Sequence, residues 1–273
     1  MGIALIVTTY DRPDALAPVL ESIASQSEAP DELIIADDGS GEATRAVIED
    51  FAERWSHPCT HVWQDHAGFG AAQARNRAIA RAHADYVILA DGDMVLDSRF
   101  IADHRAAARR GWFIQGTRIR LSAARTARIL AGDLRLPGPF GRGIGGLRRC
   151  YALHSRLGAR AMRRLANTFV AIKACNQGFW RSDLLRVNGF DATMTGWGYE
   201  DKELCARLVH AGVRRGTLLF GAIAYHLHHT AADRTSVADN RATYERTLAE
   251  RRLRADHGIV PADDDAGPTR SGR

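Results

Sequence analysis

The sequence lacks the features that would place the chain within a membrane or in an oxidising compartment. None of its apolar runs reaches the roughly 18 residues that a membrane-spanning helix needs. The amino terminus leads directly into a strand-like segment, without the basic region and cleavage site of a secretory signal. Only four cysteines are present, and none has Cys-x-x-Cys spacing: Cys59, Cys150, Cys175 and Cys205. We therefore expect buried free thiols in a reducing compartment, and a cytoplasmic protein.

Acidic residues are scarce in the middle of the chain. Residues 97–173 hold 17 of the 37 Lys and Arg residues but only three of the 32 acidic residues. A segment of this charge predicts a surface for anions such as phosphate, acidic lipid or nucleic acid. It also mixes Arg with Leu, Met and Phe, as segments that lie on membrane surfaces do. The alternative is an ordinary solvated charged face.

The first 95 residues alternate between strand patterns and helix patterns. Short β-rich apolar runs occupy residues 3–8, 32–36, 60–63 and 86–90, and helical segments at 13–26, 41–55 and 70–83 separate them. This order predicts right-handed crossovers and a mostly parallel central sheet with helices on both faces, an α/β fold. A chain of 273 residues fits one large domain of this kind.

The pattern is less regular after residue 100. We expect helices at 98–110, 148–165, 181–186, 200–210 and 239–255, and strands at 112–117, 169–180 and 216–224. Residues 118–165 suggest a mobile, arginine-rich excursion. The expected organisation is a single domain over residues 1–257, with a first half (1–96), a basic segment (97–168) and a second half (169–257). Residues 258–273 are expected to be a disordered tail.

A polar cluster follows each strand of the first half. The clusters are Thr8–Arg12, Asp37–Ser40, Asp65–Gly70 and Asp91–Asp93. In parallel α/β sheets, ligands bind beyond the carboxyl ends of the strands, so we expect all four clusters at one edge. Each cluster by itself also fits an ordinary polar turn.

Asp91-Gly92-Asp93 has the chemistry of a divalent-cation site. Mg²⁺ or Mn²⁺ commonly takes one or two carboxylates and completes its shell with phosphate oxygens and water. The alternative is an Asp-Gly turn with solvated acids. Similarly, Asp37 and Asp38 suit either a turn or carboxylates that accept from a nucleobase N–H or a ribose hydroxyl.

The segment Thr195–Asp201 has the composition of a binding loop. Gly196 and Gly198 flank Trp197, so the backbone can approach a ligand and the indole can stack on a sugar ring. Glu200 and Asp201 begin the next helix. Acids at that position are also common because they complement the helix dipole, which is the alternative interpretation.

A run of histidines follows the last expected strand, within Tyr225-His226-Leu227-His228-His229. Alternation along a strand would place His226 and His228 on one face, which suits a metal or a phosphate. The sequence does not choose between His226 and His228 as a ligand.

Taken together, these motifs resemble those of the family 2 glycosyltransferases of the GT-A fold. The matching residues are Thr8-Thr9-Tyr10-x-Arg12, Asp37-Asp38-Gly39-Ser40, Ala74-Arg75-Asn76 and Asp91-Gly92-Asp93. The stretch Gly196-Trp197-Gly198-Tyr199-Glu200-Asp201 is similar to the acceptor-side motif of β-1,4-galactosyltransferases and chondroitin-polymerase-type enzymes. Tyr199 stands where galactosyltransferases usually carry glycine.

The resemblance implies an inverting, metal-dependent transfer from a nucleotide-sugar, most often a UDP-sugar, to a hydroxyl of a glycan or glycolipid. Similar bacterial proteins assemble lipopolysaccharide or other surface polysaccharides. The implied nucleotide contacts are Thr8, Thr9, Tyr10, Arg12, Asp37, Asp38, Arg75, Asp91 and Gly92. The implied Mn²⁺ or Mg²⁺ ligands are Asp93, with Asp91 and with His226 or His228. Asp201 would be the general base, and Glu200, Trp197 and Gly198 would position the acceptor.

A separate expectation concerns the basic segment 97–173, whose charge should dock the enzyme on anionic lipid of the inner membrane or on a phosphorylated glycolipid acceptor. No nucleic-acid partner is expected. Two rival functions are a sugar-phosphate nucleotidyltransferase and a non-catalytic basic module that binds nucleic acid or membrane. The first should carry a glycine-rich triphosphate loop near the amino terminus, and residues 8–14 contain no glycine.

Overall fold

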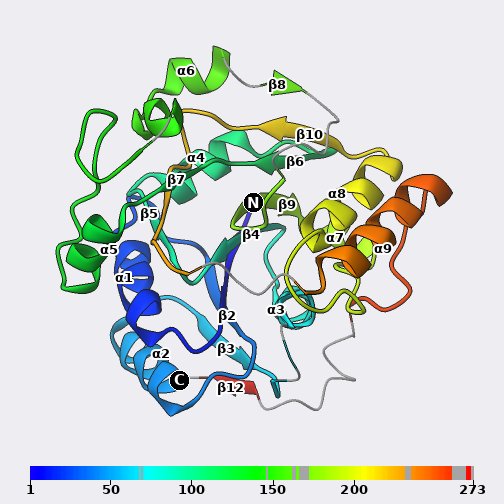
Figure 1. Ribbon diagram of the computed structural model, residues 1–273, viewed down its shortest axis with the longest axis horizontal. Helices are drawn as coiled ribbons and strands as arrows, with labels where there is room; N and C mark the ends of the chain where they lie inside the picture. The colour runs from blue at the N-terminus through cyan, green and yellow to red at the C-terminus, as the bar shows by residue number, and fades with distance from the viewer. Residues whose placement is uncertain are drawn as a thin grey trace.

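The computed structural model describes residues 1–66, 68, 70–145, 147–161, 164–165, 172–230, 235–259 and 269–271. Its first half has the predicted alternation of strands and helices (Figure 1). The strands are β1 (Ile3–Thr9), β2 (Glu32–Asp37), β3 (Cys59–Trp63) and β4 (Tyr86–Asp91), all parallel, with β1 between β2 and β4. The helices are α1 (Pro13–Ala24), α2 (Glu42–Arg54) and α3 (Ala71–Arg81).

Strands of the second half extend the sheet beyond β4. In order across the sheet they are β9 (Asn176–Trp180), β6 (Trp112–Gln115), β10 (Arg214–Thr217) and β8 (Arg164–Leu165). β9 runs antiparallel to both β4 and β6, while β6 and β10 are parallel. On the opposite edge, β12 (Thr269–Ser271) pairs antiparallel with β3, so these three residues form a strand where a disordered tail was expected.

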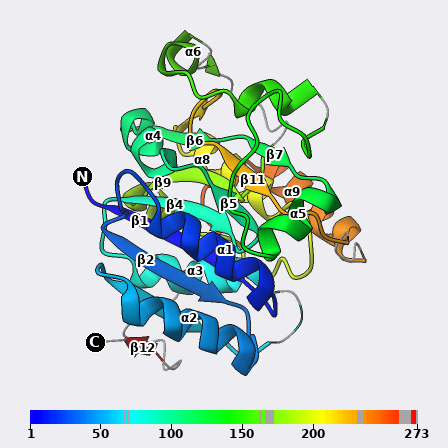
Figure 2. The same ribbon diagram turned by 90° about the vertical axis from the view of Figure 1, so that its left-hand side faces the viewer.

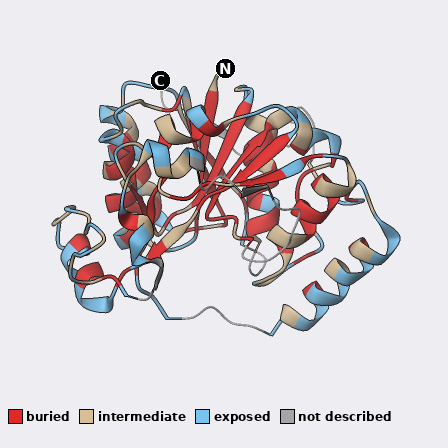
Figure 3. Ribbon diagram, turned by 90° about the horizontal axis from the view of Figure 1, so that it is seen from above, coloured by how far each residue is buried: buried red, intermediate tan, exposed pale blue. Residues whose placement is uncertain are grey.

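Helices cover both faces of the sheet, which confirms the predicted α/β layers (Figure 2). Alternation along β1 sends Ile3, Leu5 and Val7 toward one face and Ala4 and Ile6 toward the other. The first face is covered by α1, α2 and α4 (Phe100–Ala107), and the second by α3, α7 (Arg181–Arg186) and α8 (Glu200–His210). The strands are consequently buried along most of their length (Figure 3).

A second, small sheet lies beside the end of β4. It has the order β5 (Met94–Leu96), β11 (Ala224–His226) and β7 (Arg118–Arg120). The predicted single strand over residues 216–224 is therefore wrong, because its residues divide between β10 in the large sheet and β11 in the small one. Phe220 and Ala222 have positive φ angles of 60° and 44°, which no continuous strand can contain.

The basic segment folds as several short elements along one side of the molecule (Figures 1 and 2). They are α5 (Ala123–Leu130), a 3₁₀ helix η1 (Leu147–Ala152) and α6 (Arg156–Ala161). The predicted single helix over 148–165 is wrong because Ser155 starts a new helix. Its hydroxyl accepts from Gly158 N at 3.0 Å, and its own N–H donates to Phe220 O at 2.9 Å. Of the strand predicted over 169–180, residues 169–171 lie outside the described part of the chain.

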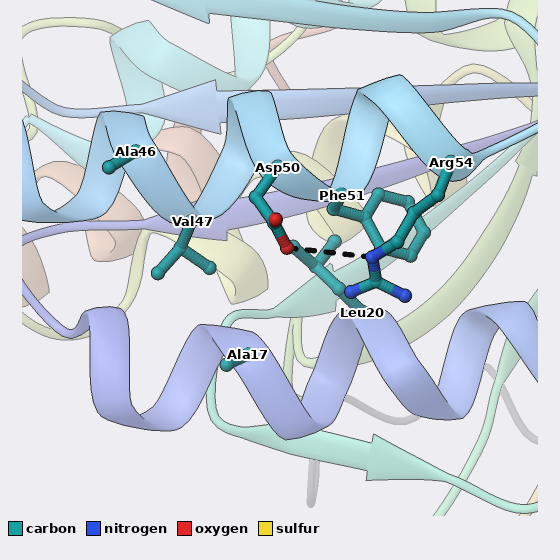
Figure 4. Close-up of a pocket in the computed structure, with 7 residues that line it drawn as sticks. All are labelled: Ala17, Leu20, Ala46, Val47, Asp50, Phe51 and Arg54. Carbon is teal, nitrogen blue, oxygen red and sulfur yellow. Dashed lines mark ion pairs between the residues drawn. The ribbon is translucent and has the colours of Figure 1, made fainter.

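A hollow between α1 and α2 lies on the outer side of the molecule (Figure 4). Its lining is mostly apolar, from Ala17, Leu20, Ala46, Val47 and Phe51. Its two charged residues, Asp50 and Arg54, form an ion pair of 3.5 Å with each other. None of these residues belongs to the predicted polar clusters, so the hollow results from how the two helices pack.

The four cysteines are all thiols, as expected, but only Cys175 and Cys205 are buried. Cys59 is half-buried and Cys150 is exposed, since it lies in η1 of the basic segment. In the described part of the chain, every helix is too short or too polar to cross a bilayer.

A fully buried ion pair holds α8 against its neighbours. Arg207 Nε and Nη2 donate to the two oxygens of Glu203 at 2.7 and 2.6 Å, and Arg207 Nη1 donates to Val187 O at 2.6 Å. Thr247 of α9 (Val237–Glu250) donates to Glu203 at 2.9 Å. The pair thereby ties together three segments that carry or support the Trp197 loop.

Replacing Arg207 with methionine should destabilise the protein by about 3–5 kcal/mol, because a buried carboxylate would be left without its partner. Urea unfolding measures the change. In the double variant Glu203→Met/Arg207→Met, the loss should be clearly smaller than the sum of the two single losses. Additive losses would contradict the coupling described here.

Candidate active site

Strand register brings the first polar clusters together. Thr8 of β1 pairs with Asp91 of β4, and Thr9 pairs with Asp37 of β2, so the strands end side by side. Gly92 N donates to Thr8 O at 2.7 Å, and a Cβ atom on Gly92 would lie only 3.1 Å from that oxygen. Glycine therefore allows the chain after β4 to turn tightly against the end of β1.

Arg75 of α3 connects this edge to the second half of the chain. Its side chain donates to Thr8 Oγ1 at 3.2 Å and to Asp91 Oδ1 at 3.0 Å. On its other side, Nη1 lies 3.6 Å from Glu200 Oε1. Arg75 is 4% exposed, so these contacts are held inside the protein. The cluster of Arg75, Asp91 and Glu200 confirms that residues far apart in sequence meet here.

Glu200 also fixes the loop that carries Trp197. Its Oε2 accepts from Gly198 N at 3.0 Å. The loop needs its glycines, since Gly196 has a φ of +77° and a Cβ atom there would lie 2.2 Å from Ser236 Oγ. Trp197 itself is 42% exposed. The geometry makes Glu200 a positioning residue for this loop.

Tyr199 adopts a left-handed conformation with a φ of 73°, which favours glycine. The Tyr199 ring lies 5.5 Å from the ring of Tyr244 on α9, and Lys202 Nζ lies 4.3 Å from its centre. These contacts offset the backbone strain. They explain how a tyrosine stands at a position where glycine is the simpler choice.

Asp201 is half-buried at the start of α8, and Lys202 N donates to its Oδ1 at 2.7 Å. Burial, and then the neighbouring charge of Glu200, raise the pKa of Asp201 to about 7. A carboxyl group with this pKa takes up and releases a proton near neutral pH, as a general base must.

Asp93, His226 and His229 form a cluster that we call the ligand trio. Asp93 Oδ2 lies 3.3 Å from His226 Nε2 and 3.1 Å from His229 Nε2, and the three ligand atoms lie within 4.8 Å of one another. The small sheet builds the trio, because His226 ends β11 and Leu227 N donates to Asp93 O at 2.9 Å just before β5.

The trio has the donor set of a divalent-cation site. Asp93 Oδ1 is buried and accepts no hydrogen bond from the described residues. Burial lowers the pKa of His226 to about 4, so its imidazole is neutral at pH 7, the form that binds metal. One carboxylate with two imidazoles suits Mn²⁺.

Two predicted metal ligands lie outside the trio. His228 is exposed, and its N–H donates to Thr126 Oγ1 at 2.8 Å. The prediction of one shared face for His226 and His228 is wrong because β11 ends at His226, so strand alternation does not continue. Asp91 pairs with Arg75 instead. His229 was missed, although the run of histidines pointed to this segment.

The predicted nucleotide contacts are brought to the same edge but differ in accessibility. Asp37 is 1% exposed, and its oxygens accept from Ser40 N and face His61 Nε2, both at 2.8 Å. Asp38 is 3% exposed, with Gln64 Nε2 at 2.6 Å and Gly70 N at 2.7 Å. Both carboxylates therefore brace the loops of this edge, and their contacts with a nucleoside stay a prediction.

More accessible groups lie above the two carboxylates. Tyr10 is 43% exposed and stacks on His66 with a centroid distance of 4.1 Å and an interplanar angle of 8°. Arg12 forms a 2.8 Å ion pair with Asp14 at the start of α1. His66 was not predicted individually, although it belongs to the polar cluster that follows β3.

Comparison with known proteins identifies the family of the chain. Residues 4–166 match the family model "Glycosyl transferase family 2", and residues 164–230 match "N-terminal domain of galactosyltransferase". Validoxylamine A glucosyltransferase of Streptomyces hygroscopicus subsp. limoneus is 25% identical over 77% of this chain and 48% of its own length. Chondroitin synthase of Escherichia coli is 25% identical over 82% of this chain and 34% of its own length.

Solved glycosyltransferases share the fold. TarS 1–349 of S. aureus, in complex with UDP, superimposes with a TM-score of 0.64 at 15% identity over 96% of this chain and 68% of that one. The mannosyltransferase PcManGT of Pyrobaculum calidifontis, in complex with GDP-Man and Mn²⁺, gives a TM-score of 0.60 at 16% identity over 95% and 66%. The chain spans about half or less of the length of the curated relatives described above. Because the family model covers more than half of it, the chain belongs to glycosyl transferase family 2, and it has the GT-A fold.

Proposed function

We propose that this glycosyltransferase moves a sugar from a UDP-sugar to a hydroxyl of a glycan or glycolipid, with inversion and with a divalent cation. The observation that carries the proposal is a chain of contacts that connects the ligand trio to the proposed general base. Asp93 follows Asp91, which pairs with Arg75, and Arg75 in turn contacts the Glu200 that precedes Asp201. A donor held on one side can thus meet an acceptor on the other.

The residues divide the reaction between them. The ligand trio would hold a Mn²⁺ or Mg²⁺, which would supply positive charge to stabilise the leaving diphosphate. Asp201 takes the proton of the acceptor hydroxyl while the hydroxyl oxygen bonds to the anomeric carbon. The bond from that carbon to the phosphate oxygen breaks, and its electron pair leaves with the nucleoside diphosphate. One base without a covalent nucleophile gives inversion, so an α-linked donor yields a β-linked product.

The two halves of the chain would bind different substrates. Residues 1–96 would hold the nucleotide, with Tyr10 offering its exposed ring to the base and the Thr8–Arg12 loop contacting the nucleoside. Residues 169–257 would hold the acceptor, with Trp197 stacking on a sugar ring. The two family-model matches meet at residues 164–166, close to this division, which supports it.

The acceptor class is inferred from the relatives. Chondroitin synthase and the poly-β-1,6-N-acetyl-D-glucosamine synthase of Staphylococcus epidermidis are both named for polysaccharide products. We infer that this enzyme contributes to a bacterial lipopolysaccharide or another surface polysaccharide.

A panel of nucleotide-sugars tested with Mn²⁺ and simple glycan acceptors examines the proposal. We expect donor turnover that stops when EDTA removes the metal, and NMR should show that the anomeric configuration of the product is opposite to that of the donor. Retention of configuration, or turnover that is unchanged by EDTA, would contradict the proposed mechanism.

The basic segment exposes apolar side chains that suit an anionic membrane surface. Phe140 is 93% exposed and Leu157 is 80% exposed. They are accompanied by the exposed arginines Arg128, Arg135 and Arg149. Apolar groups that enter the headgroup region while guanidinium groups contact acidic lipid produce reversible binding. We propose that this surface docks the enzyme at the membrane.

Flotation with liposomes tests this docking. The wild-type protein should float with vesicles that contain acidic lipid and should be released as salt is raised, because the screening length falls to about 3 Å at 1 M ionic strength. Phe140→Ser/Leu157→Ser should reduce the bound fraction several-fold. Leu253→Ser, at a 55% exposed position that follows α9, serves as a control and should bind normally. Equal flotation with neutral and acidic vesicles would refute docking.

A further inference from the structure

Three cationic side chains lie next to the ligand trio and have no role in the proposed chemistry so far. Arg118 and Arg120 are on β7, which pairs in parallel with β11. In that register Arg118 lies opposite Ala224, and Arg120 lies opposite His226. Residues opposite each other project from the same face of a sheet, so both arginines share the face of His226. Ile119, between them, points into the core and is 1% exposed.

Neither arginine forms a direct ion pair within the described part of the chain. Among the described residues, no carboxylate lies within ion-pair distance of Arg118 or Arg120, whereas Arg75 and Arg125 both have carboxylate partners. Arg118 Nε is buried and donates to no described acceptor. A buried guanidinium N–H without an acceptor is costly, and a bound anion would remove that cost.

Lys173 is the third cation, and its charge interacts with those of both arginines. The side-chain amide of Gln115 fixes its backbone, because Gln115 Oε1 accepts from Lys173 N and Gln115 Nε2 donates to Lys173 O, both at 3.1 Å. Gln115 is only 2% exposed, so the anchor is rigid. Burial and then the charge of Arg118 lower the pKa of Lys173, and Asp201 is another of its charged neighbours. The charges of Arg118 and of the proposed general base therefore both act on Lys173.

We propose that Arg118, with Lys173 and Arg120, binds the diphosphate of the nucleotide donor and stabilises it as the leaving group. The inference rests on the proposed function, because it places the diphosphate at the ligand trio. The diphosphate gains negative charge as its bond to the sugar breaks. Fixed cations stabilise this charge more in a partly buried site than in water. Planar guanidinium groups match phosphate oxygens with two donors at once.

Calorimetric titration of UDP, GDP and UMP, each with saturating Mn²⁺, tests the proposal. Arg118→Met and Lys173→Met should each weaken binding of the preferred diphosphate about 10- to 100-fold, the effect of one charge-assisted hydrogen bond. Binding of UMP, which lacks the second phosphate, should change less. Arg118→Lys should restore part of the affinity. Arg142→Met, at an exposed position in the same basic segment, should bind as the wild type does.

The outcomes separate this proposal from the proposed function. Titration of Mn²⁺ alone should show that every variant binds the ion at least as tightly as the wild type, which shows that the trio is intact. If the wild type binds UDP or GDP and the Arg118→Met and Lys173→Met variants bind it equally well, the inference is overturned. A rise in the acceptor KM alone would then assign these cations to an anionic acceptor. A wild type that binds neither diphosphate would refute the proposed function and the inference with it.

Discussion

Replacing Asp93 with asparagine should lower turnover by about 10³-fold or more with any donor that the wild type uses. Asp93 supplies the only carboxylate of the ligand trio, with His226 and His229 at 3.3 and 3.1 Å. A divalent cation contributes several kcal/mol to stabilising the leaving group, and each 1.4 kcal/mol changes the rate tenfold. Initial rates with Mn²⁺, together with the Mn²⁺ affinity from the EPR signal of the free ion, measure both losses.

The histidine run provides a matched control for this prediction. His226→Ala and His229→Ala should each weaken Mn²⁺ binding, whereas His228→Ala should leave it unchanged, because His228 is exposed and outside the trio. The assignment would be overturned by an Asp93→Asn variant that keeps both its Mn²⁺ affinity and its turnover. The opposite histidine pattern, with His228 essential and His229 dispensable, would also overturn it.

The substitution Asp201→Asn should lower kcat by about 10²- to 10⁴-fold, the contribution of a well-placed general base. The pH dependence of wild-type activity should report the ionisation of the same carboxyl group. Burial and the neighbouring Glu200 raise the pKa of Asp201 from 3.8 to about 7, so its basic form is lost as the pH falls below 7. Activity should therefore fall about tenfold per pH unit below 7, whereas an ordinary aspartate would stay ionised to about pH 4.

Two further variants make this prediction specific. In Asp201→Asn, the residual activity should no longer show the acid limb near pH 7, and nucleotide binding should be unchanged. The control Asp239→Asn removes an exposed carboxylate at the start of α9 and should behave as the wild type. If Asp201→Asn retains both its rate and the acid limb, another group acts as the base.

The fold of the first half could be predicted from the sequence because its signals are local. Strands such as Ile3–Thr9 and Tyr86–Asp91 are short β-rich runs, and the helices between them bury a regular apolar stripe. Parallel strands of this kind place their carboxyl ends together, and the register Thr8 to Asp91 confirms it. The meeting of Asp91, Arg75 and Glu200 followed from motif order and from the resemblance to a known family.

Other features depend on contacts that the local sequence does not show. The boundary of β11 at His226 is set by pairing with β5 and β7, and it decides that His229, instead of His228, reaches Asp93. The burial of Asp37 and Asp38 depends on His61 of β3 and on the loop after β3, which supplies Gln64 and Gly70 as partners. The sequence does not distinguish Arg118 from the other arginines of the basic segment. The pairing of β7 with β11 places it on the same face as His226.

The most direct test of the account is a crystal structure with Mn²⁺ and UDP, with diffraction data collected at the manganese absorption edge. We expect one anomalous peak at bonding distance from Asp93, His226 and His229, with the diphosphate between this ion and Arg118. Asp201 should face the same cavity from the start of α8. A manganese peak elsewhere, or a diphosphate bound away from Asp93, would contradict the single shared site proposed here.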